Sequence, residues 1–208
     1  KADELDSWLD SGVNSIVLVE PHPLLAQKLR KRTAAMPQVT LVEVALTSEA
    51  NLNQLHEYNL PSLDSLRLPS GLKEIFPGLK IKKSYPVETE GLTQLLEQYL
   101  PESDKTTHLI IEAAGEETAL IAELIDSGNL ERITSISLVA GIEALYEGTQ
   151  PAAVLLEQLK ANGYELQSEV TLNPEWGHWE LQRNPLVDEI TNLKLQLEQT
   201  TFSSAKEK

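Results

Sequence analysis

The feature that most constrains the fold is a regular alternation of short apolar runs with segments of helical spacing. Residues 16–20 read Ile-Val-Leu-Val-Glu, and residues 108–112 read His-Leu-Ile-Ile-Glu. Nearly continuous apolar runs of this length, bounded by turn residues, are typical of strands buried on both faces of a parallel sheet. The segments that follow them have apolar residues three and four apart, which predicts helices that cross over the sheet.

The alternation predicts a definite order of elements. Helices are expected at residues 3–10, 24–35, 92–99, 116–126 and 151–161, and strands at 16–20, 39–46, 80–87, 108–112, 133–139, 164–172 and 176–182. Asn173-Pro174-Glu175 separates the last two strands and favours an antiparallel hairpin. Residues 1–183 are therefore expected to form an α/β domain with three layers, a Rossmann-like, mostly parallel sheet and a C-terminal antiparallel hairpin.

Two segments depart from this pattern. Residues 47–86 contain short apolar stretches interrupted by proline and glycine, and we expect a loop-rich insertion with short helical turns. Residues 184–208 are expected to form a helix, which Asn184 caps and Pro185 opens.

This C-terminal helix has a heptad pattern. Leu186, Ile190, Leu193 and Leu197 follow one another at spacings of four, three and four. The pattern predicts either the start of a coiled coil, which binds a protein partner or a second copy of the chain, or a helix that packs back on the domain.

Composition excludes several classes of function. The formal net charge of -15 repels nucleic acid and anionic lipid surfaces, so neither is an expected partner. No apolar run approaches the roughly 20 residues that cross a bilayer, and the N-terminal residues do not resemble a signal peptide. The chain has no cysteine, and its four histidines lack ligand spacing, so no metal site is predicted. We expect a soluble, cytoplasmic protein.

Three motifs, taken in order, resemble those of the FkbM-type methyltransferases. Residues 16–23 (Ile-Val-Leu-Val-Glu-Pro-His-Pro) resemble the second strand of that family, and residues 44–48 (Val-Ala-Leu-Thr-Ser) the end of its third. Residues 109–117 (Leu-Ile-Ile-Glu-Ala-Ala-Gly-Glu-Glu) resemble its fourth-strand motif. The resemblance covers about residues 3 to 172 and implies a class I fold that binds S-adenosylmethionine.

The resemblance also implies where the cofactor would lie. Glu20, followed by Pro21, stands at the carboxyl end of a strand, where a carboxylate can accept both hydroxyl protons of a ribose. Ala45 and Leu46 would line an adenine pocket. The alternatives are an exposed acid at a strand end for Glu20 and ordinary core packing for Ala45 and Leu46.

Glu112 and Glu117 are the candidate catalytic residues. A carboxylate at this strand-to-helix junction can orient an acceptor hydroxyl, or act as a general base if burial raises its pKa towards neutrality. The alternative is that acids in the first turn of a helix simply interact favourably with its dipole.

The chain also departs from the family. Residues 1–15 contain no glycine-rich loop for the methionine part of the cofactor, and Ala114 stands where the family has Glu. Two functions follow: a degenerate methyltransferase-like domain that acts as a recognition or assembly module, or an active O-methyltransferase for a sugar or small polar acceptor. The second requires a glycine loop upstream of Lys1.

Overall fold

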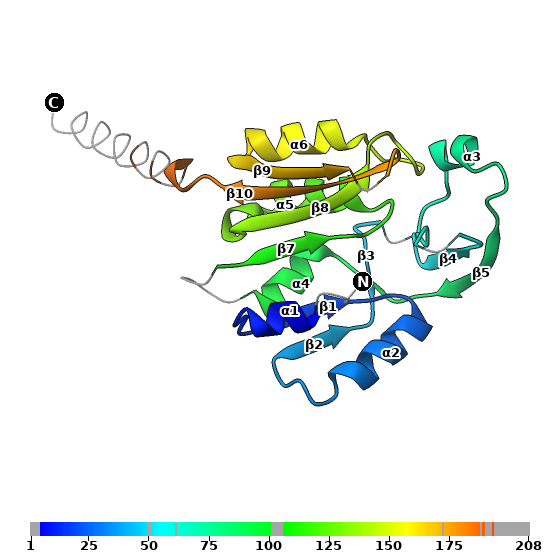
Figure 1. Ribbon diagram of the computed structural model, residues 1–208, viewed down its shortest axis with the longest axis horizontal. Coiled ribbons are helices and arrows are strands. Elements are labelled where there is room, and N and C mark those ends of the chain that lie inside the picture. Colours follow the sequence, from blue (N-terminus) through cyan, green and yellow to red (C-terminus); the bar gives the residue numbers. More distant parts are fainter. Residues whose placement is uncertain are drawn as a thin grey trace, which may run out of the picture.

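In a computed structural model of the chain, the strands among the described residues form one sheet of four strands and three pairs (Figure 1). The structure describes residues 5–49, 51–60, 62–100, 106–171 and 173–187, together with Glu189 and Leu193. Helices and strands alternate along most of this length, so the predicted mixed α/β class is confirmed.

The bounds of the elements lie close to most of the predicted ones. The helices are α1 (Leu5–Asp10), α2 (Pro23–Thr33), α3 (Gly71–Ile75), α4 (Leu92–Tyr99), α5 (Glu117–Asp126), the 3-10 helix η2 (Asn129–Arg132) and α6 (Ala152–Ala161). The strands are β1 (Ile16–Val19), β2 (Val39–Val42), β3 (Ala45–Leu46), β4 (Gln54–Tyr58), β5 (Ile81–Pro86), β6 (Thr89–Glu90), β7 (His108–Ile111), β8 (Ser135–Gly141), β9 (Tyr164–Thr171) and β10 (Trp176–Arg183).

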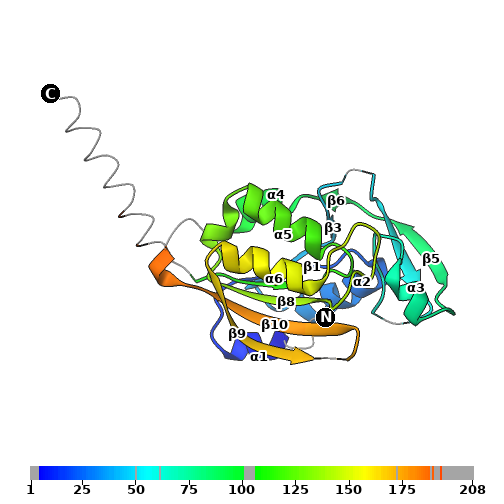
Figure 2. The same ribbon diagram turned by 90° about the horizontal axis from the view of Figure 1, so that it is seen from above.

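The four-stranded sheet has the order β7-β8-β10-β9. β7 and β8 are parallel, whereas β10 is antiparallel to both β8 and β9, which confirms the predicted C-terminal hairpin. The sheet is therefore mixed rather than mostly parallel. Figure 2 shows α4, α5 and α6 together on one of its faces.

The main core lies between this sheet and these helices. Ile121 and Leu124 of α5 are 0% and 1% exposed, and they belong to the same cluster as Ile136 and Leu138 of β8. Removing one such side chain from water contributes about 1.5–3 kcal/mol. The apolar face of helix α5 and the buried side chains of strand β8 thus pack together in one apolar layer.

The outer strand β9 is exposed along nearly its whole length. Only Tyr164 is buried, and its hydroxyl donates to the carbonyl of Leu130 at 2.9 Å. Glu165 and Glu169 are exposed, and the register against β10 shifts between Glu180 and Leu181. β9 is an edge strand that pairs on one side, with β10.

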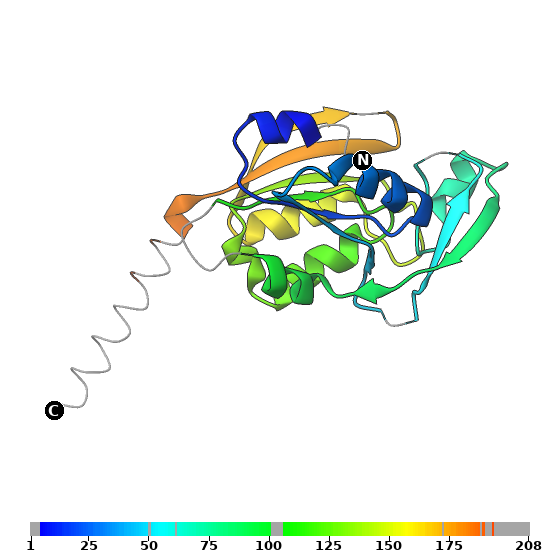
Figure 3. The same ribbon diagram turned by 90° about the horizontal axis from the view of Figure 1, so that it is seen from below.

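β1 and β2 form a separate parallel pair. Figure 3 shows α1 and α2 towards one face of the strands and α4, α5 and α6 towards the other. Asp6 of α1 accepts from Arg32 of α2 at 3.0 Å, which joins these two helices. The expected single sheet is divided here, because no strand pairing joins β1 to β7 within the described residues.

Residues 39–46 do not form the one strand that we expected. The chain pairs with β1 as far as Val42, and then the amide of Ala45 donates to the carbonyl of Glu88 at 2.8 Å. β3 therefore pairs with β6 in another small parallel sheet. The change of backbone partner divides the strand.

The insertion at residues 47–86 contains more regular structure than predicted. β4 and β5 pair antiparallel, and α3 lies between them in the sequence. The strand β4 was not expected, since Gln-Leu-His-Glu-Tyr is short and mostly polar.

The C-terminal helix falls largely outside the described residues, as do Ile190 and Leu197. Leu186 and Leu193 are described, and each is 57% exposed. In the part of the chain that the structure covers, no helix is both long and apolar enough to span a membrane.

Candidate functional site

The ends of β1, β3, β7 and β8 define one edge of the fold, beside which the insertion lies (Figure 1). Each sequence-predicted site residue except Glu117, which begins α5, lies in or just after one of these strands. Glu20 follows β1, Ala45 and Leu46 form β3, and Glu112 follows β7.

Glu20 is half-buried directly after β1. Its Oε1 accepts the backbone N–H of His22 at 2.9 Å, which fixes the turn into α2. Burial raises the pKa of Glu20, and the hydrogen bond from His22 opposes this rise. One oxygen of the Glu20 carboxylate is thus bonded to the backbone of the protein. Pro21, the next residue in the sequence, is half-buried.

His22 attaches the insertion to this turn. Its Nδ1 accepts the N–H of Leu24 at 3.2 Å, which caps α2, and its ring lies 4.9 Å from the ring of Tyr85. Its Nε2 lies 3.8 Å from Oε2 of Glu57, to which the hydroxyl of Tyr85 also donates at 2.9 Å. The amino end of α2 is therefore covered by β4 and β5.

Ala45 and Leu46 pack in apolar surroundings. Ala45 is 3% exposed and shares a small core with Leu55 and Leu66 of the insertion. Leu46 is half-buried against the main core. In this arrangement both side chains contribute to packing.

The turn from β7 into α5 passes close to the insertion. Ser65 donates from Oγ to the carbonyl of Ala114 at 2.6 Å. Gly115 has a φ of +89°, and a Cβ at this position would lie 2.7 Å from Ser65 Oγ and 3.1 Å from Tyr146 Cγ. Only glycine fits this turn without strain. Glu112, in contrast, is exposed.

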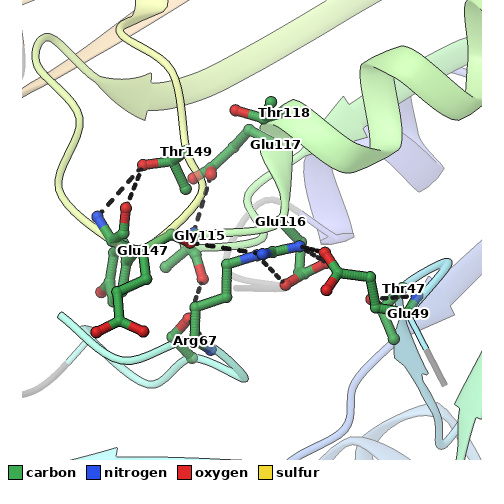
Figure 4. A network of polar contacts seen from close by, with 12 residues as sticks. Thr47, Glu49, Arg67, Gly115, Glu116, Glu117, Thr118, Glu147 and Thr149 are labelled. Carbon is green, nitrogen blue, oxygen red and sulfur yellow. Dashed lines mark hydrogen bonds and ion pairs between the residues drawn. The ribbon is translucent and has the colours of Figure 1, made fainter. Parts of the chain in front are cut away.

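Arg67 lies in the middle of the polar contacts at this edge (Figure 4). Its Nε lies 2.7 Å from Oε1 of Glu116, and its Nη2 lies 2.5 Å from Oε1 of Glu49. Thr47, at the end of β3, also hydrogen-bonds Glu116. Burial raises the pKa of Glu116 and the Arg67 guanidinium opposes the rise. One cation therefore holds three chain segments together.

Glu117 is the most deeply buried of the predicted catalytic residues. Its Oε2 accepts the N–H of Gly115 at 2.9 Å. Burial raises the pKa of this carboxyl to about 8, although hydrogen bonds from backbone amides oppose the rise. At neutral pH the group therefore holds its proton, which is the state of a general acid or of a hydrogen-bond donor.

A small depression opens beside Glu117. It is also bordered by Gly141, Tyr146, Thr149 and Trp176, and its cavity volume is about 10 Å³, roughly the space that one water molecule needs. A nucleoside cofactor does not fit in a space of this size.

The structure brings together some predicted residues and adds others. Glu117 bonds the backbone of Gly115, next to the Glu116 that pairs with Arg67, whereas Glu112 is exposed and Glu20 lies beside the His22 turn. Sequence reasoning missed Arg67 and Ser65, because nothing in a proline-rich segment indicates which polar side chain is buried. In the ranges that the structure describes, no three His, Asp or Glu residues are placed to hold a metal ion.

Comparisons of the chain with protein-family models, with curated proteins and with solved structures found no match.

Proposed function

We propose that this chain is a methyltransferase-like α/β domain that serves as a recognition or assembly module. In Figure 1 the strands follow one another as β2, β1, β7, β8, β10 and β9, with helices towards both faces in Figures 2 and 3. This succession supports a three-layer, Rossmann-like arrangement whose sheet is mostly parallel apart from β10. The FkbM-type motifs support the same relationship.

One observation favours the function of a recognition or assembly module over that of an enzyme: side chains of the protein close the edge where a cofactor would bind. Arg67 pairs with Glu116 and Glu49, and Ser65 is bonded to Ala114. The depression beside Glu117 has room for about one water molecule, which is far less than a nucleoside needs. Cofactor entry would require these contacts to break.

Calorimetry tests this part of the proposal. Titration of the 208-residue chain with S-adenosylmethionine is expected to give no binding in the micromolar range. The matched variant is Glu20→Gln, which keeps the size of the side chain and removes its charge. Micromolar binding of S-adenosylmethionine by the wild type that is lost in Glu20→Gln would refute the module proposal and favour the enzyme.

The C-terminal helix supplies the assembly surface in this proposal. Leu186 and Leu193 are each 57% exposed and lie seven residues apart, which places both on one helix face. We propose that a second copy of the chain covers this face, since leucine at successive heptad positions is self-complementary.

Light scattering tests the assembly surface. We expect the mass of the wild type to exceed that of one chain and Leu193→Asp to reduce it. Leu24→Asp is the control, because Leu24 is 56% exposed on α2, away from the heptad. A mass that Leu193→Asp leaves unchanged would rule out self-association through this helix.

A single observation favours the active O-methyltransferase as a second candidate. Glu20 is a half-buried carboxylate at a strand end, and burial raises its pKa. One of its oxygens remains for a ribose hydroxyl after the bond from His22. Here S-adenosylmethionine would supply the methyl group, and Glu117, in its ionised form, would accept the proton that the acceptor hydroxyl releases.

A further inference from the structure

Strand β9 has one free backbone edge. It lies at the end of the four-stranded sheet and, among the described residues, pairs only with β10 (Figure 1). The amide of Arg183 donates to the carbonyl of Thr134 at 2.9 Å, so the backbone groups of Arg183 point towards β8. Because these groups point alternately to the two sides of a strand, every second residue of β10 does the same, and the residues of β9 that face them point outwards. The outward-pointing residues include Leu166, Glu169 and Thr171.

An apolar side chain is exposed on each face of β9. Leu166 is 38% exposed and faces Leu181, on the side of the main core. Val170 is 53% exposed and faces His178, on the opposite side of the sheet. Polar side chains alone would suffice on a strand whose outer edge meets only water. The exposure of both apolar side chains therefore indicates a surface that another segment covers.

A carboxylate accompanies each of these apolar side chains. Glu169 lies on the face of Leu166, and Glu165 lies on the face of Val170. Glu165 accepts from the side-chain amide of Asn184 at 2.7 Å. Within the part of the chain that the structure describes, neither glutamate forms an ion pair. Each face of β9 thus presents one apolar side chain and one carboxylate that lacks a cation.

This combination of charge and exposed backbone determines which segment fits. A second β9 placed against the first would bring glutamates together, and like charges on neighbouring strands repel. The formal net charge of the chain, -15, adds to this repulsion and attracts basic segments instead. Extended peptides bind sheet edges by adding a strand, where main-chain hydrogen bonds give affinity and the side chains of the edge give specificity.

We propose that β9 binds an extended basic segment of a partner protein, which adds to the sheet as a further strand beside Leu166, Glu169 and Thr171. The segment carries one apolar and one basic side chain on each face. Its cations meet the two glutamates, and its apolar side chains cover Leu166 and Val170. The proposal rests on the recognition function proposed above and names the chemistry of the partner.

Fluorescence anisotropy with a labelled peptide tests the proposal on the 208-residue chain. The probe is three repeats of Lys-Thr-Val, in which successive lysines fall on opposite faces of a strand. We expect saturable binding to the wild type. Binding to the double variant Glu165→Lys with Glu169→Lys should be about tenfold weaker, because two attractive pairs of exposed charges become repulsive.

A matched control separates the edge of β9 from the net charge of the protein. Glu74→Lys with Glu97→Lys changes the net charge by the same amount, at exposed positions of α3 and α4. This variant should bind the peptide within about twofold of the wild type, because salt screens charges that lie far from the peptide. Equal weakening in both double variants would overturn the proposal.

Amide hydrogen exchange shows whether the peptide pairs with the backbone. Saturating peptide should slow exchange about tenfold or more at Leu166, Glu169 and Thr171. The amide of Val170 points to β10 and should change much less. A peptide with proline in place of each threonine keeps the lysines, loses backbone donors and should not bind.

Several results would refute the proposal. These are the absence of saturable binding, undiminished binding of the proline peptide, and binding that leaves the three outward amides unchanged. Protection of these amides without peptide, increasing with protein concentration, would assign the edge to a second copy of the chain. Titration with S-adenosylmethionine distinguishes the two proposals: micromolar binding would refute the module, while peptide binding in the same sample would keep the β9 surface.

Discussion

The contact between Arg67 and Glu116 allows a sharp test of how burial sets the strength of an ion pair. The side chains are 11% and 4% exposed. Replacing Arg67 with alanine leaves the Glu116 carboxylate without its cation in a site that water scarcely reaches. Removing one partner of a buried pair typically costs 3–5 kcal/mol. We expect about 3 kcal/mol, because burial already raises the pKa of Glu116 and proton uptake relieves part of the loss.

The chain offers a matched control in Arg30 and Glu43, whose side chains are 66% and 36% exposed. Arg30→Ala removes the same functional group from a solvated pair, which contributes about 0–1 kcal/mol. Urea unfolding followed by tryptophan fluorescence measures both losses. The double variant Arg67→Ala with Glu116→Gln should recover part of the loss, because glutamine needs no counter-charge. Equal losses for Arg67→Ala and Arg30→Ala would refute the reasoning.

Two further predictions concern the same turn. The folded pKa of Glu117, about 8, lies above the ordinary 4.5, so the folded chain keeps a proton that the unfolded chain loses. The stabilising contribution of the protonated Glu117 is complete below about pH 4.5 and disappears as the pH rises to about 8. Urea midpoints measured between pH 5 and 8 should therefore decline in the wild type and decline less in Glu117→Gln. An unchanged slope in the variant would contradict the raised pKa of Glu117. Gly115→Ala should lower stability by more than the roughly 1 kcal/mol expected for Gly128→Ala, because both positions have positive φ and only Gly115 has Ser65 and Tyr146 in the way. Equal thermal midpoints for Gly115→Ala and Gly128→Ala would show that Ser65 and Tyr146 move to make room for the added methyl group.

The sequence predicted those parts of the fold where apolar periodicity is strong. α4 begins and ends at the predicted residues, and β10 differs from its prediction by one residue. Trp176 and Trp179 are three apart in the sequence, a spacing that predicts opposite faces of a strand and at least one of the two in the core. Trp179 is 4% exposed, which confirms this expectation.

Long-range pairing could not be predicted in the same way. The run at residues 39–46 is apolar apart from Thr40 and Glu43, and its pattern does not indicate that the chain changes partner from β1 to β6 at Ala45. The candidate site shows the same limit. A carboxylate such as Glu117 is recognisable by its motif, but the contacts that hold its turn, from Ser65 to Ala114 and from Arg67 to Glu116, come from residues about fifty positions away in the sequence.

The two kinds of strand edge have different consequences for solubility. The outer edge, β9, carries Glu165 and Glu169 and a register shift, features that hinder edge-to-edge aggregation. The inner edges of β1 and β7 carry Val17 and Ile110 and have no such protection. Aggregation at rising concentration is therefore expected through the edges of β1 and β7 and not through β9.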